Sequence, residues 1–277
     1  MWAAASNAAA PYVGGRPADG AVLGPTGCSA PPDLAPDGLD PSQAGGERHE
    51  RTRFHRLDVD GTLVDSTYHH AMAWHRAFAM SELRQPLWRI HRRIGTGGDH
   101  LVSAVAGEEV EARLGDDLRR AWGTEYDKLI VEVIPLPGAA DLIRSLKEKG
   151  FRVALASSGP REHTECSADL LGVKDLVDAI TSSADADSSK PAADISSVDL
   201  RKCGGTSAIV VGDSVCDAES ALRLPAPCVA VRTGGFGAAE LKEAGAVLVV
   251  DGSEQLARKG AALLEGRQAA AGRAASA

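Results

Sequence analysis

The sequence Leu57-Asp58-Val59-Asp60-Gly61-Thr62-Leu63-Val64-Asp65-Ser66 runs from an apolar strand end into a turn. Its first two acids, Asp58 and Asp60, stand two positions apart, and because side chains alternate along a strand they point to the same side. Gly61 allows a sharp turn directly behind them. In open α/β sheets, the C-terminal ends of the strands face the crevice where ligands bind. The stretch therefore predicts a site with paired carboxylates at a strand end.

Beyond residue 135, short apolar runs alternate with helical patterns. We expect strands at 151–156, 208–211, 228–231 and 246–250, and helices at 139–149, 161–171, 192–203, 217–224, 238–244 and 254–264. Strands that alternate with helices form βαβ units, which build parallel sheets. The expected fold class is therefore α/β: a Rossmann-like parallel sheet with helices on both faces, formed by residues 51–65 and 135–265.

Residues 66–134 interrupt this alternation. They show helical periodicity with apolar anchors, among them Trp74 and Trp88, and no clear strand pattern. We interpret the segment as an all-helical cap domain inserted after the first strand. Both tryptophans are expected in the core of that domain rather than in a stacking platform for a ligand.

The two ends of the chain are expected to lie outside the folded domains. In residues 1–50, 26 of the 50 positions are Ala, Gly or Pro, and no apolar periodicity runs through them. Such a segment buries too little apolar surface to offset the entropy of ordering it. We expect a disordered low-complexity tail at 1–50 and a flexible C-terminus at 266–277.

Composition excludes several classes of protein. The formal net charge of −8 disfavours general binding of nucleic acid or of anionic membranes. No apolar run approaches the roughly 18 residues that a transmembrane helix needs. The five cysteines are odd in number and form no C-x-x-C motif, which argues against a disulfide framework or a structural zinc site. We expect a cytoplasmic protein, a monomer or a homodimer, that acts on a small molecule.

Three further polar motifs follow predicted strands or open predicted helices. The apolar strand at 151–156 leads into Ser157, whose hydroxyl is suited to bind phosphoryl oxygens. Lys190 directly precedes Pro191 at a predicted helix start. The strand at 208–211 leads into Gly-Asp-Ser with Asp213, and Asp217 follows four residues later in the first turn of a helix.

The four acids Asp58, Asp60, Asp213 and Asp217 would converge in one crevice of such a sheet. Unpaired carboxylates so close together raise one another's pKa values and do not all stay ionised without a cation. An all-oxygen acidic site suits a hard cation, and Mg²⁺ is favoured because it binds a few carboxylates, keeps waters and bridges to phosphate. No His or Cys belongs to these motifs, which disfavours zinc.

Taken together and in this order, the motifs resemble the haloacid dehalogenase-like hydrolase superfamily. The resemblance covers about residues 53–260. It is to the branch of phosphoglycolate phosphatases and beta-phosphoglucomutases, which carry a helical cap.

The resemblance implies phosphoryl transfer through an aspartyl-phosphate. Asp58 would be the nucleophile, and Asp60 would protonate the leaving group and then activate water. Ser157 and Lys190, together with Mg²⁺, would neutralise the phosphoryl oxygens. The implied metal ligands are Asp58, Asp60 through its backbone carbonyl, and Asp213, with Asp217 bound directly, through water, or used to orient Lys190.

Substrate contacts are expected from the core and from the cap. His70 falls where a mutase-type histidine approaches the transferring group, although a helix histidine satisfied by backbone or solvent is the simpler interpretation. The loop 93–99 is glycine-rich and would reach into the active site. Ser158 is expected to cap the helix that follows it. The substrate-binding residues expected are Thr62, His70, Gly97, Gly98, Ser158 and Gly159.

These motifs discriminate among four functions. A Mg²⁺-dependent phosphatase for a small phosphate monoester, phosphoglycolate-like or sugar-phosphate-like, is favoured. A phosphomutase of the beta-phosphoglucomutase type is the alternative that His70 suggests. A non-catalytic partner-binding protein is disfavoured because every motif residue is present. Dehalogenation is disfavoured too, because a halide leaving group needs neither the acid Asp60 nor a Mg²⁺ site.

One feature departs from the family pattern. The residues before Asp58 normally form a continuous apolar strand, but here His55 and Arg56 stand within it. A charge in a central strand that is buried on both faces is costly. We therefore expect either that these residues emerge at an edge of the sheet or that the start of the fold is atypical.

Overall fold

The computed structural model describes residues 53–185, 207–224 and 226–258. The predicted tail at 1–50, Lys190, the predicted helix at 192–203 and the C-terminus at 266–277 lie outside the described residues.

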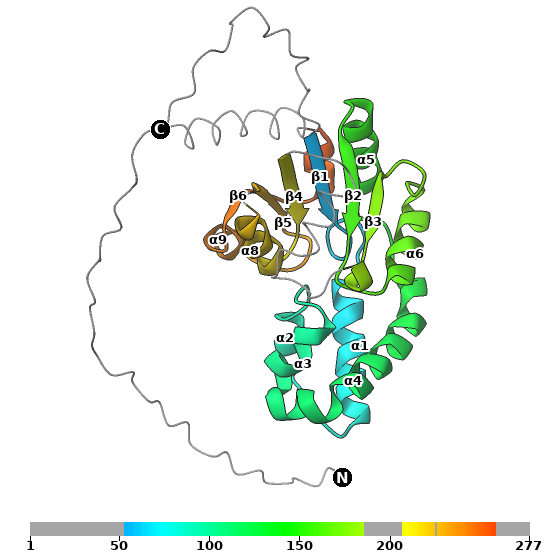
Figure 1. Cartoon of the computed structure of the whole chain (residues 1–277), viewed down its shortest axis with the longest axis vertical. Coiled ribbons are helices and arrows are strands. Elements are labelled where there is room, and N and C mark those ends of the chain that lie inside the picture. The colour runs from blue at the N-terminus through cyan, green and yellow to red at the C-terminus, as the bar shows by residue number, and fades with distance from the viewer. Residues whose placement is uncertain (1–52, 186–206, 225, 259–277) are drawn as a thin grey trace, which may run out of the picture. The chain divides into compact units, whose positions relative to one another are not determined.

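Six strands form one parallel sheet in the order β3-β2-β1-β4-β5-β6 (Figure 1). The strands are β1 (Arg53–Asp58), β2 (Arg152–Ala156), β3 (Ala179–Thr181), β4 (Ser207–Gly212), β5 (Cys228–Val231) and β6 (Ala246–Val250). Every neighbouring pair is parallel. This confirms the expected α/β class, since parallel neighbours need crossover connections that helices supply.

Helices cover both faces of the sheet. On one face, α5 (Ala139–Glu148), α6 (Arg161–Leu171) and the helical residues 253–258 pack on a core formed by β1, β2, β4 and β5. On the other face, α8 (Val215–Arg223) and α9 (Ala238–Glu243) pack on β4 and β5. Leu142, Ile143 and Leu146 of α5 share one side of their helix, as the spacing in the sequence predicts.

The segment between β1 and β2 begins with four helices and a short 3₁₀ turn, grouped at one end of the sheet (Figure 1). They are α1 (Thr67–Met80), α2 (Leu87–His91), α3 (Gly98–Ala106), α4 (Glu108–Leu129) and the 3₁₀ turn η2 (Ile130–Glu132). A separate apolar cluster holds α1 to α4 together. We call α1 to α4 the helical insert.

The two tryptophans expected in the core of the insert differ in how far they are exposed to solvent. Trp74 is 3% exposed and belongs to the apolar cluster, whereas Trp88 is 70% exposed, so the expectation for Trp88 is wrong. The reason is the shortness of α2, whose five residues bury only one side through Ile90 and His91.

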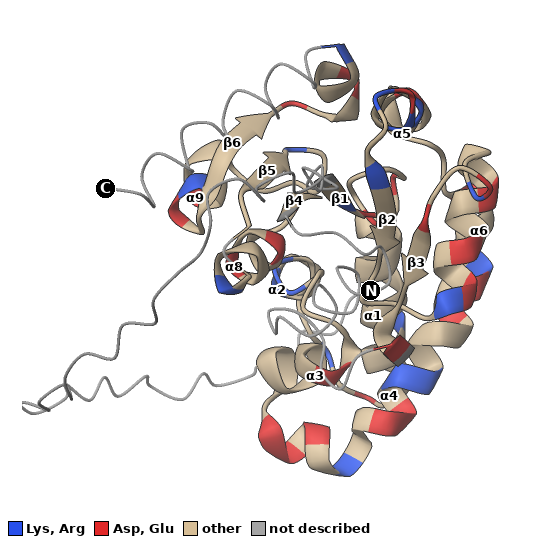
Figure 2. Cartoon of the chain, turned by 45° about the horizontal axis from the view of Figure 1, so that its top comes forward, with Lys and Arg blue, Asp and Glu red and all other residues tan. Residues whose placement is uncertain are grey.

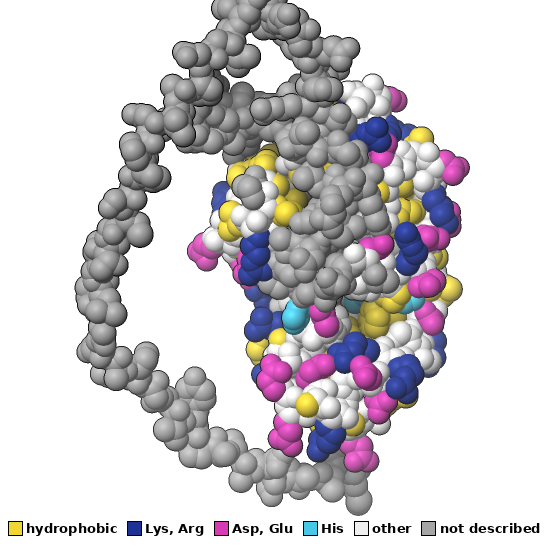
Figure 3. Space-filling model, viewed as in Figure 1, with side chains coloured by type: hydrophobic (Ala, Val, Ile, Leu, Met, Phe, Trp, Pro, Cys, Tyr) yellow, Lys and Arg dark blue, Asp and Glu magenta, His cyan; other side chains and the backbone are white. Residues whose placement is uncertain are grey.

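Charged residues of both signs cover the outside of the insert. Acidic and basic side chains alternate along α4 in the ribbon (Figure 2), and the visible face of the insert shows them interspersed (Figure 3). None of the helices in the described part of the chain is long and apolar enough to cross a bilayer.

Several polar contacts join the insert to the rest of the chain, from α1, from α2 and the residue after it, and from α4. The ring of His91 on α2 lies 3.0 Å from the carbonyl oxygen of Gly234, and His163 of α6 lies 2.8 Å from Oδ1 of Asp127 on α4. A further pair of contacts comes from Arg92, which donates to Glu240, and from His70 of α1, whose Nε2 lies 3.0 Å from Oδ1 of Asp60. α4 is held mainly by the insert's own helices.

His55 and Arg56 lie at the centre of the sheet. β1 is flanked by β2 and β4, and both side chains are only 1% exposed, so the expectation of an edge position is wrong. The ring of His55 packs edge-on against Phe151 at 4.7 Å between centroids. Arg56 points to the opposite face, where its Nη1 lies 3.8 Å from Oδ1 of Asp217. Burial of the charge is possible because the fold places an acid beside it.

α6 begins where it is expected, but its cap differs from expectation, and so does the start of α8. α6 begins after Pro160, so Ser158 is not its cap and that expectation is wrong. A proline at this point has a fixed φ suited to the approach to a helix. α8 begins at Val215 rather than at Asp217, because Ser214 already caps the helix.

Candidate active site

The turn after β1 holds the two acids of the first motif. Asp58 is the last residue of β1 and is 4% exposed. The N–H of Gly61 donates to the carbonyl of Val64 over 2.9 Å. Gly61 has φ +76°, and a Cβ at this position would lie 2.4 Å from Oδ2 of Asp213. Glycine is therefore required both by the left-handed backbone and by the close approach of Asp213.

The second acidic segment leaves β4 and enters α8. Asp213 follows the strand directly and accepts a hydrogen bond from the hydroxyl of Thr62 over 3.1 Å. Ser214 and Asp217 form a capping box: the N–H of Asp217 donates to Ser214 Oγ, and Ser214 donates through both its N–H and its hydroxyl to Asp217 Oδ2. The helix start thereby fixes Asp217 against the strand end.

Three buried carboxylates meet at these strand ends. Asp58, Asp213 and Asp217 each offer an oxygen, and the three oxygens lie within 4.8 Å of one another. They are 4%, 3% and 1% exposed. Three anionic oxygens at this spacing repel one another, and a hard divalent cation is the ligand that such a donor set fits. The side chain of Asp60 is not part of the cluster.

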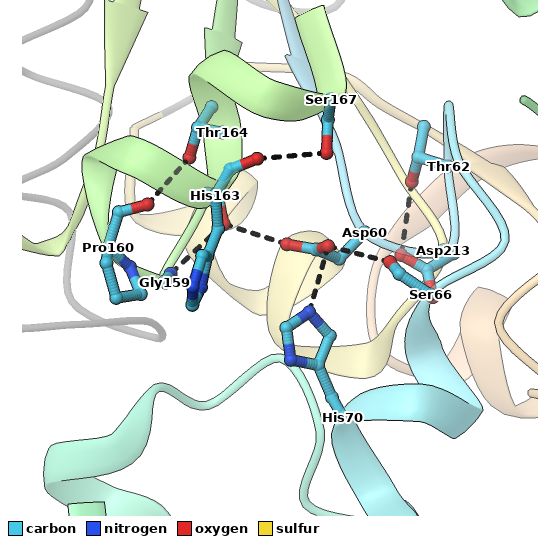
Figure 4. Close-up of polar contacts among 11 residues, drawn as sticks. Asp60, Thr62, Ser66, His70, Gly159, Pro160, His163, Thr164, Ser167 and Asp213 are labelled. Carbon is cyan, nitrogen blue, oxygen red and sulfur yellow. Dashed lines mark hydrogen bonds and ion pairs between the residues drawn. The ribbon is translucent and has the colours of Figure 1, made fainter. Parts of the chain in front are cut away.

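Asp60 is instead turned toward α1 and β2 (Figure 4). Its Oδ1 accepts from the hydroxyl of Ser66 over 2.7 Å and lies 3.0 Å from Nε2 of His70, and its Oδ2 accepts from the hydroxyl of Ser157 over 2.8 Å. Burial opposes ionisation of Asp60, but the charge of His70 and the hydrogen bonds from His70, Ser66 and Ser157 outweigh it. They hold the pKa of Asp60 well below its ordinary range.

His70 is held by an aromatic stack from α4. Its ring lies parallel to that of Tyr126, with centroids 3.9 Å apart, and is also stacked near Trp122 at 5.6 Å. Burial raises the pKa of Tyr126, and the charge of Asp60 adds to this effect, so its hydroxyl stays neutral. The stack leaves Nε2 of His70 directed at Asp60, which fixes the direction of that hydrogen bond.

A pocket of about 470 Å³ opens over the acids. Its floor includes Asp58, Asp60 and Asp213, and its opposite wall comes from the insert. The insert contributes mainly apolar and aromatic side chains, together with two basic residues and one acid: Trp74, Ile94, Leu101, Trp122, His70, Arg119 and Asp99.

The glycine-rich loop of the insert reaches the floor of this pocket. Gly95 has φ +97°, and a Cβ there would lie 2.8 Å from the hydroxyl oxygen of Ser214. Gly97 and Gly98 also line the pocket. The backbone of this loop therefore approaches the acidic segment more closely than any side chain would allow.

Most of the residues expected at the site are brought together. Those that line the pocket are Asp58, Asp60, His70, Gly97, Gly98, Ser158, Gly159 and Asp213. Ser157 contacts the pocket's acid Asp60 instead. Thr62 is fully buried and donates to Asp213, so its hydroxyl supports an acid of the cluster and does not line the pocket. Lys190 lies outside the described residues.

Several residues of the site have no role assigned from sequence. Ser66 is the last residue of the first motif and donates a hydrogen bond to Asp60. Its place in the motif is the sequence signal that indicates this role. Trp122 and Tyr126 stand four positions apart within the segment 66–134 that is expected to be helical, a spacing that puts both on one face of a helix. Arg119 shares that helix but carried no signal of its own, because a lone arginine on a charged helix is common.

Comparison with protein families gives one match. The model of the haloacid dehalogenase-like hydrolase family matches residues 57–224, which is more than half of the chain. The matched range contains both acidic segments and the whole helical insert.

Relatives of known name and structure agree with this match. A validoxylamine A 7'-phosphate phosphatase from Streptomyces hygroscopicus subsp. limoneus is 25% identical over 49% of this chain and 63% of its own length. A phosphoglycolate phosphatase from Pasteurella multocida is 30% identical over 43% of this chain and 58% of its own length. The chain thus spans less than two thirds of these two relatives. A hydrolase of known structure from Pseudomonas syringae is 28% identical, with a TM-score of 0.70, over 74% of this chain and 95% of that one.

Proposed function

Because the chain belongs to the haloacid dehalogenase-like hydrolase family, we propose that it is a phosphatase that hydrolyses a small phosphate monoester. The observation that carries the proposal is the position of Asp58 and Asp60 at the end of β1. Both carboxylates line one pocket, yet only Asp58 lies in the acidic cluster. Two carboxylates with different surroundings are suited to different chemical roles.

We assign the nucleophile to Asp58 and the acid–base role to Asp60. Asp58 attacks phosphorus, the bond to the ester oxygen breaks, and the leaving oxygen takes a proton from Asp60. Water then gives a proton to Asp60 and attacks the phosphorus of the aspartyl-phosphate, which releases phosphate and restores Asp58. Because its pKa is lowered, Asp60 is ionised in the structure, which leaves its carboxylate able to accept the proton of water in the second step.

The proton for the first step is assigned to the Asp60–His70 pair. His70 Nε2 lies 3.0 Å from Asp60 Oδ1. A proton carried by that nitrogen is therefore within hydrogen-bond distance of the carboxylate that passes it to the leaving oxygen. Ser157 holds the other oxygen of Asp60 in this arrangement, and Ser157 with Lys190 is proposed to bind phosphoryl oxygens once substrate enters.

Asp58, Asp213 and Asp217 are the residues that would hold a divalent cation, for which we propose Mg²⁺. The bound cation would supply positive charge beside the phosphoryl group. The close spacing of the three buried carboxylates supports this assignment. Thr62 and Ser214 orient two of these ligands through the hydrogen bonds that their hydroxyls donate.

We propose that residues 66–134 act as a cap that selects the substrate, and that this substrate is a sugar-type ester rather than phosphoglycolate. A glycolate carboxylate needs an available cation. Arg119 and His70 are the basic residues that the described part of the pocket offers, and both are already engaged. The guanidinium of Arg119 donates to Glu111, Asp116 and the carbonyl of Gly98, and Nε2 of His70 lies 3.0 Å from Oδ1 of Asp60. A neutral ring, in contrast, fits an aromatic wall.

Hydrolysis of p-nitrophenyl phosphate with and without Mg²⁺ tests the proposal. We expect Mg²⁺-dependent release of phosphate that Asp58→Asn abolishes. Asp65→Asn is the matched control, because Asp65 belongs to the same motif but does not line the pocket. Turnover that survives Asp58→Asn would sink the mechanism.

A panel of esters then separates the finer alternatives. Hexose phosphates are expected to be hydrolysed faster than 2-phosphoglycolate, and the reverse order would contradict the substrate assignment. The position of His70 beside Asp60 also suits a phosphomutase. That function would yield an isomerised sugar phosphate, after activation by a bisphosphate, in place of free phosphate.

A further inference from the structure

Arg56 is a buried charge that the proposed reaction does not use. It lies in the interior of β1, with Ala154 of β2 and Val210 of β4 beside it in the sheet. Both neighbours are fully buried, and the side chain of Arg56 is 1% exposed. An apolar side chain would pack at this position without the cost of removing a guanidinium from water. A compensating electrostatic role is therefore needed.

The strand geometry directs Arg56 to the underside of the acidic cluster. It stands two positions before Asp58, so both side chains leave the same face of β1. Its Nη1 lies 3.8 Å from Oδ1 of Asp217, which is also 1% exposed. The other oxygen of Asp217 accepts from Ser214. The carboxylate of Asp217 is thus held from two sides, by the helix cap and by the buried cation.

The negative charges of the cluster explain why the positive charge of Arg56 matters at this place. Asp58, Asp213 and Asp217 bring three formal negative charges into a buried site. Arg56 offsets one of them from within the protein. The opposite face of the strand shows the contrast, because His55 there packs against the ring of Phe151 and lies away from the acids.

We propose that Arg56 is a built-in counter-ion and positioning residue of the acidic cluster. It holds Asp217 in place and lowers the repulsion among the three carboxylates, so that the cluster is assembled before a divalent cation binds. This inference rests on the proposed function only in taking the cluster as a cation site.

Unfolding of the full chain in EDTA and in excess Mg²⁺ tests this role. Arg56→Met keeps an unbranched side chain in place of the aliphatic part of arginine and removes the charge. We expect the melting temperature of the metal-free protein to fall by on the order of 10 °C. The rise in melting temperature on adding Mg²⁺ should be about twice that of the unchanged protein, because the added cation replaces the missing charge.

Two controls separate charge from packing. Arg56→Lys keeps the charge and should restore the Mg²⁺-induced rise toward that of the unchanged protein. Arg232→Met removes an exposed arginine that pairs with Asp251 at the end of the same sheet, and it should leave the rise unchanged. An equal Mg²⁺-induced rise in Arg56→Met and in the unchanged protein would overturn the proposal.

If Arg56→Met does not fold, variants of the acids test the same role of Arg56. Asp217→Asn retains one oxygen for Ser214 but leaves Arg56 with a neutral neighbour, so it should lower the melting temperature of the metal-free protein. Asp213→Asn removes a repelling charge that the ion pair of Arg56 does not involve, so it should not lower it. Equal losses from both variants would contradict the role of Arg56. Because the readout is unfolding, this test is independent of whether the chain hydrolyses a phosphate ester.

Discussion

The two walls of the pocket differ in how they are built. The wall at the sheet carries charge: Asp58 and Asp213 lie at the ends of β1 and β4, and the hydroxyl of Thr62 donates to Asp213. The wall from the insert is largely apolar and aromatic, and the guanidinium of Arg119 is already bonded to acids of its own helix. Under the proposed function, the sheet wall carries the chemistry and the insert wall carries the choice of substrate.

The largest effect is expected at the sheet wall. Asp60→Asn removes the acid and base, and we expect kcat for any ester to fall by about 10³-fold, a typical contribution of general acid–base catalysis. Steady-state rates with p-nitrophenyl phosphate and with a hexose phosphate measure this. If kcat falls strongly for one ester and not for the other, the sheet wall also selects substrate, which would contradict the division of roles between the two walls.

A smaller effect is expected where the two walls meet. His70→Gln removes the aromatic stack on Tyr126 and weakens the contact with Asp60. We expect kcat to fall by about tenfold, because misplacement of a catalytic group is costly even when the group is present. His75→Gln is the matched control on the same helix, since His75 contacts the carbonyl of Gln85 instead. Equal losses from both variants would show that only the helix, not the pair, is affected.

A substitution in the insert wall should change the preference between esters without changing the chemical step. Trp122→Leu removes an aromatic surface worth about 1 kcal/mol, which corresponds to about fivefold in kcat/KM for a hexose phosphate. The value for 2-phosphoglycolate should change little. Trp88→Leu is the control, because Trp88 is exposed on α2 and does not line the pocket. A parallel loss for both esters would mean that the insert wall does not discriminate between them.

The smallest effect is expected at Asp178, which lies away from both walls, and it concerns the stability of the fold rather than catalysis. Burial raises the pKa of Asp178, but hydrogen bonds from Lys147 and the N–H of Val153 outweigh it and hold that pKa below its ordinary value of 3.8. Stability from a lowered carboxylate pKa is complete above the ordinary value and is lost as pH falls through the lowered one.

Asp178→Asn should therefore cost about 1 kcal/mol of unfolding free energy at pH 7 and progressively less as pH falls below 3.8. Urea unfolding at several pH values measures this loss. Asp141→Asn, which changes an exposed acid of α5, should change stability little at any pH. A loss for Asp178→Asn that stays constant with pH would contradict the ionic origin.

The sequence predicts the sheet wall better than the insert wall for a physical reason. Asp58 and Asp213 follow apolar strands directly, and in a parallel sheet the ends of neighbouring strands come together whatever the connections between them. The stack of His70 on Tyr126 depends on how α1 and α4 cross, which no local pattern specifies. Arg56 shows the same limit, because its burial is understandable only once Asp217 is known to lie beside it.

The central position of β1 also has a consequence for how the chain folds. β1 ends at Asp58, but its two neighbours begin at Arg152 and Ser207, so the strand has no partner until much later segments are available. The insert between them is held by local contacts, which form faster than distant ones. In pulse-labelled hydrogen exchange we expect the amides of α1 and α4 to gain protection before those of β1, and the reverse order would contradict this. During that interval, the charges of Arg53 and Arg56 within β1 oppose its pairing with another chain.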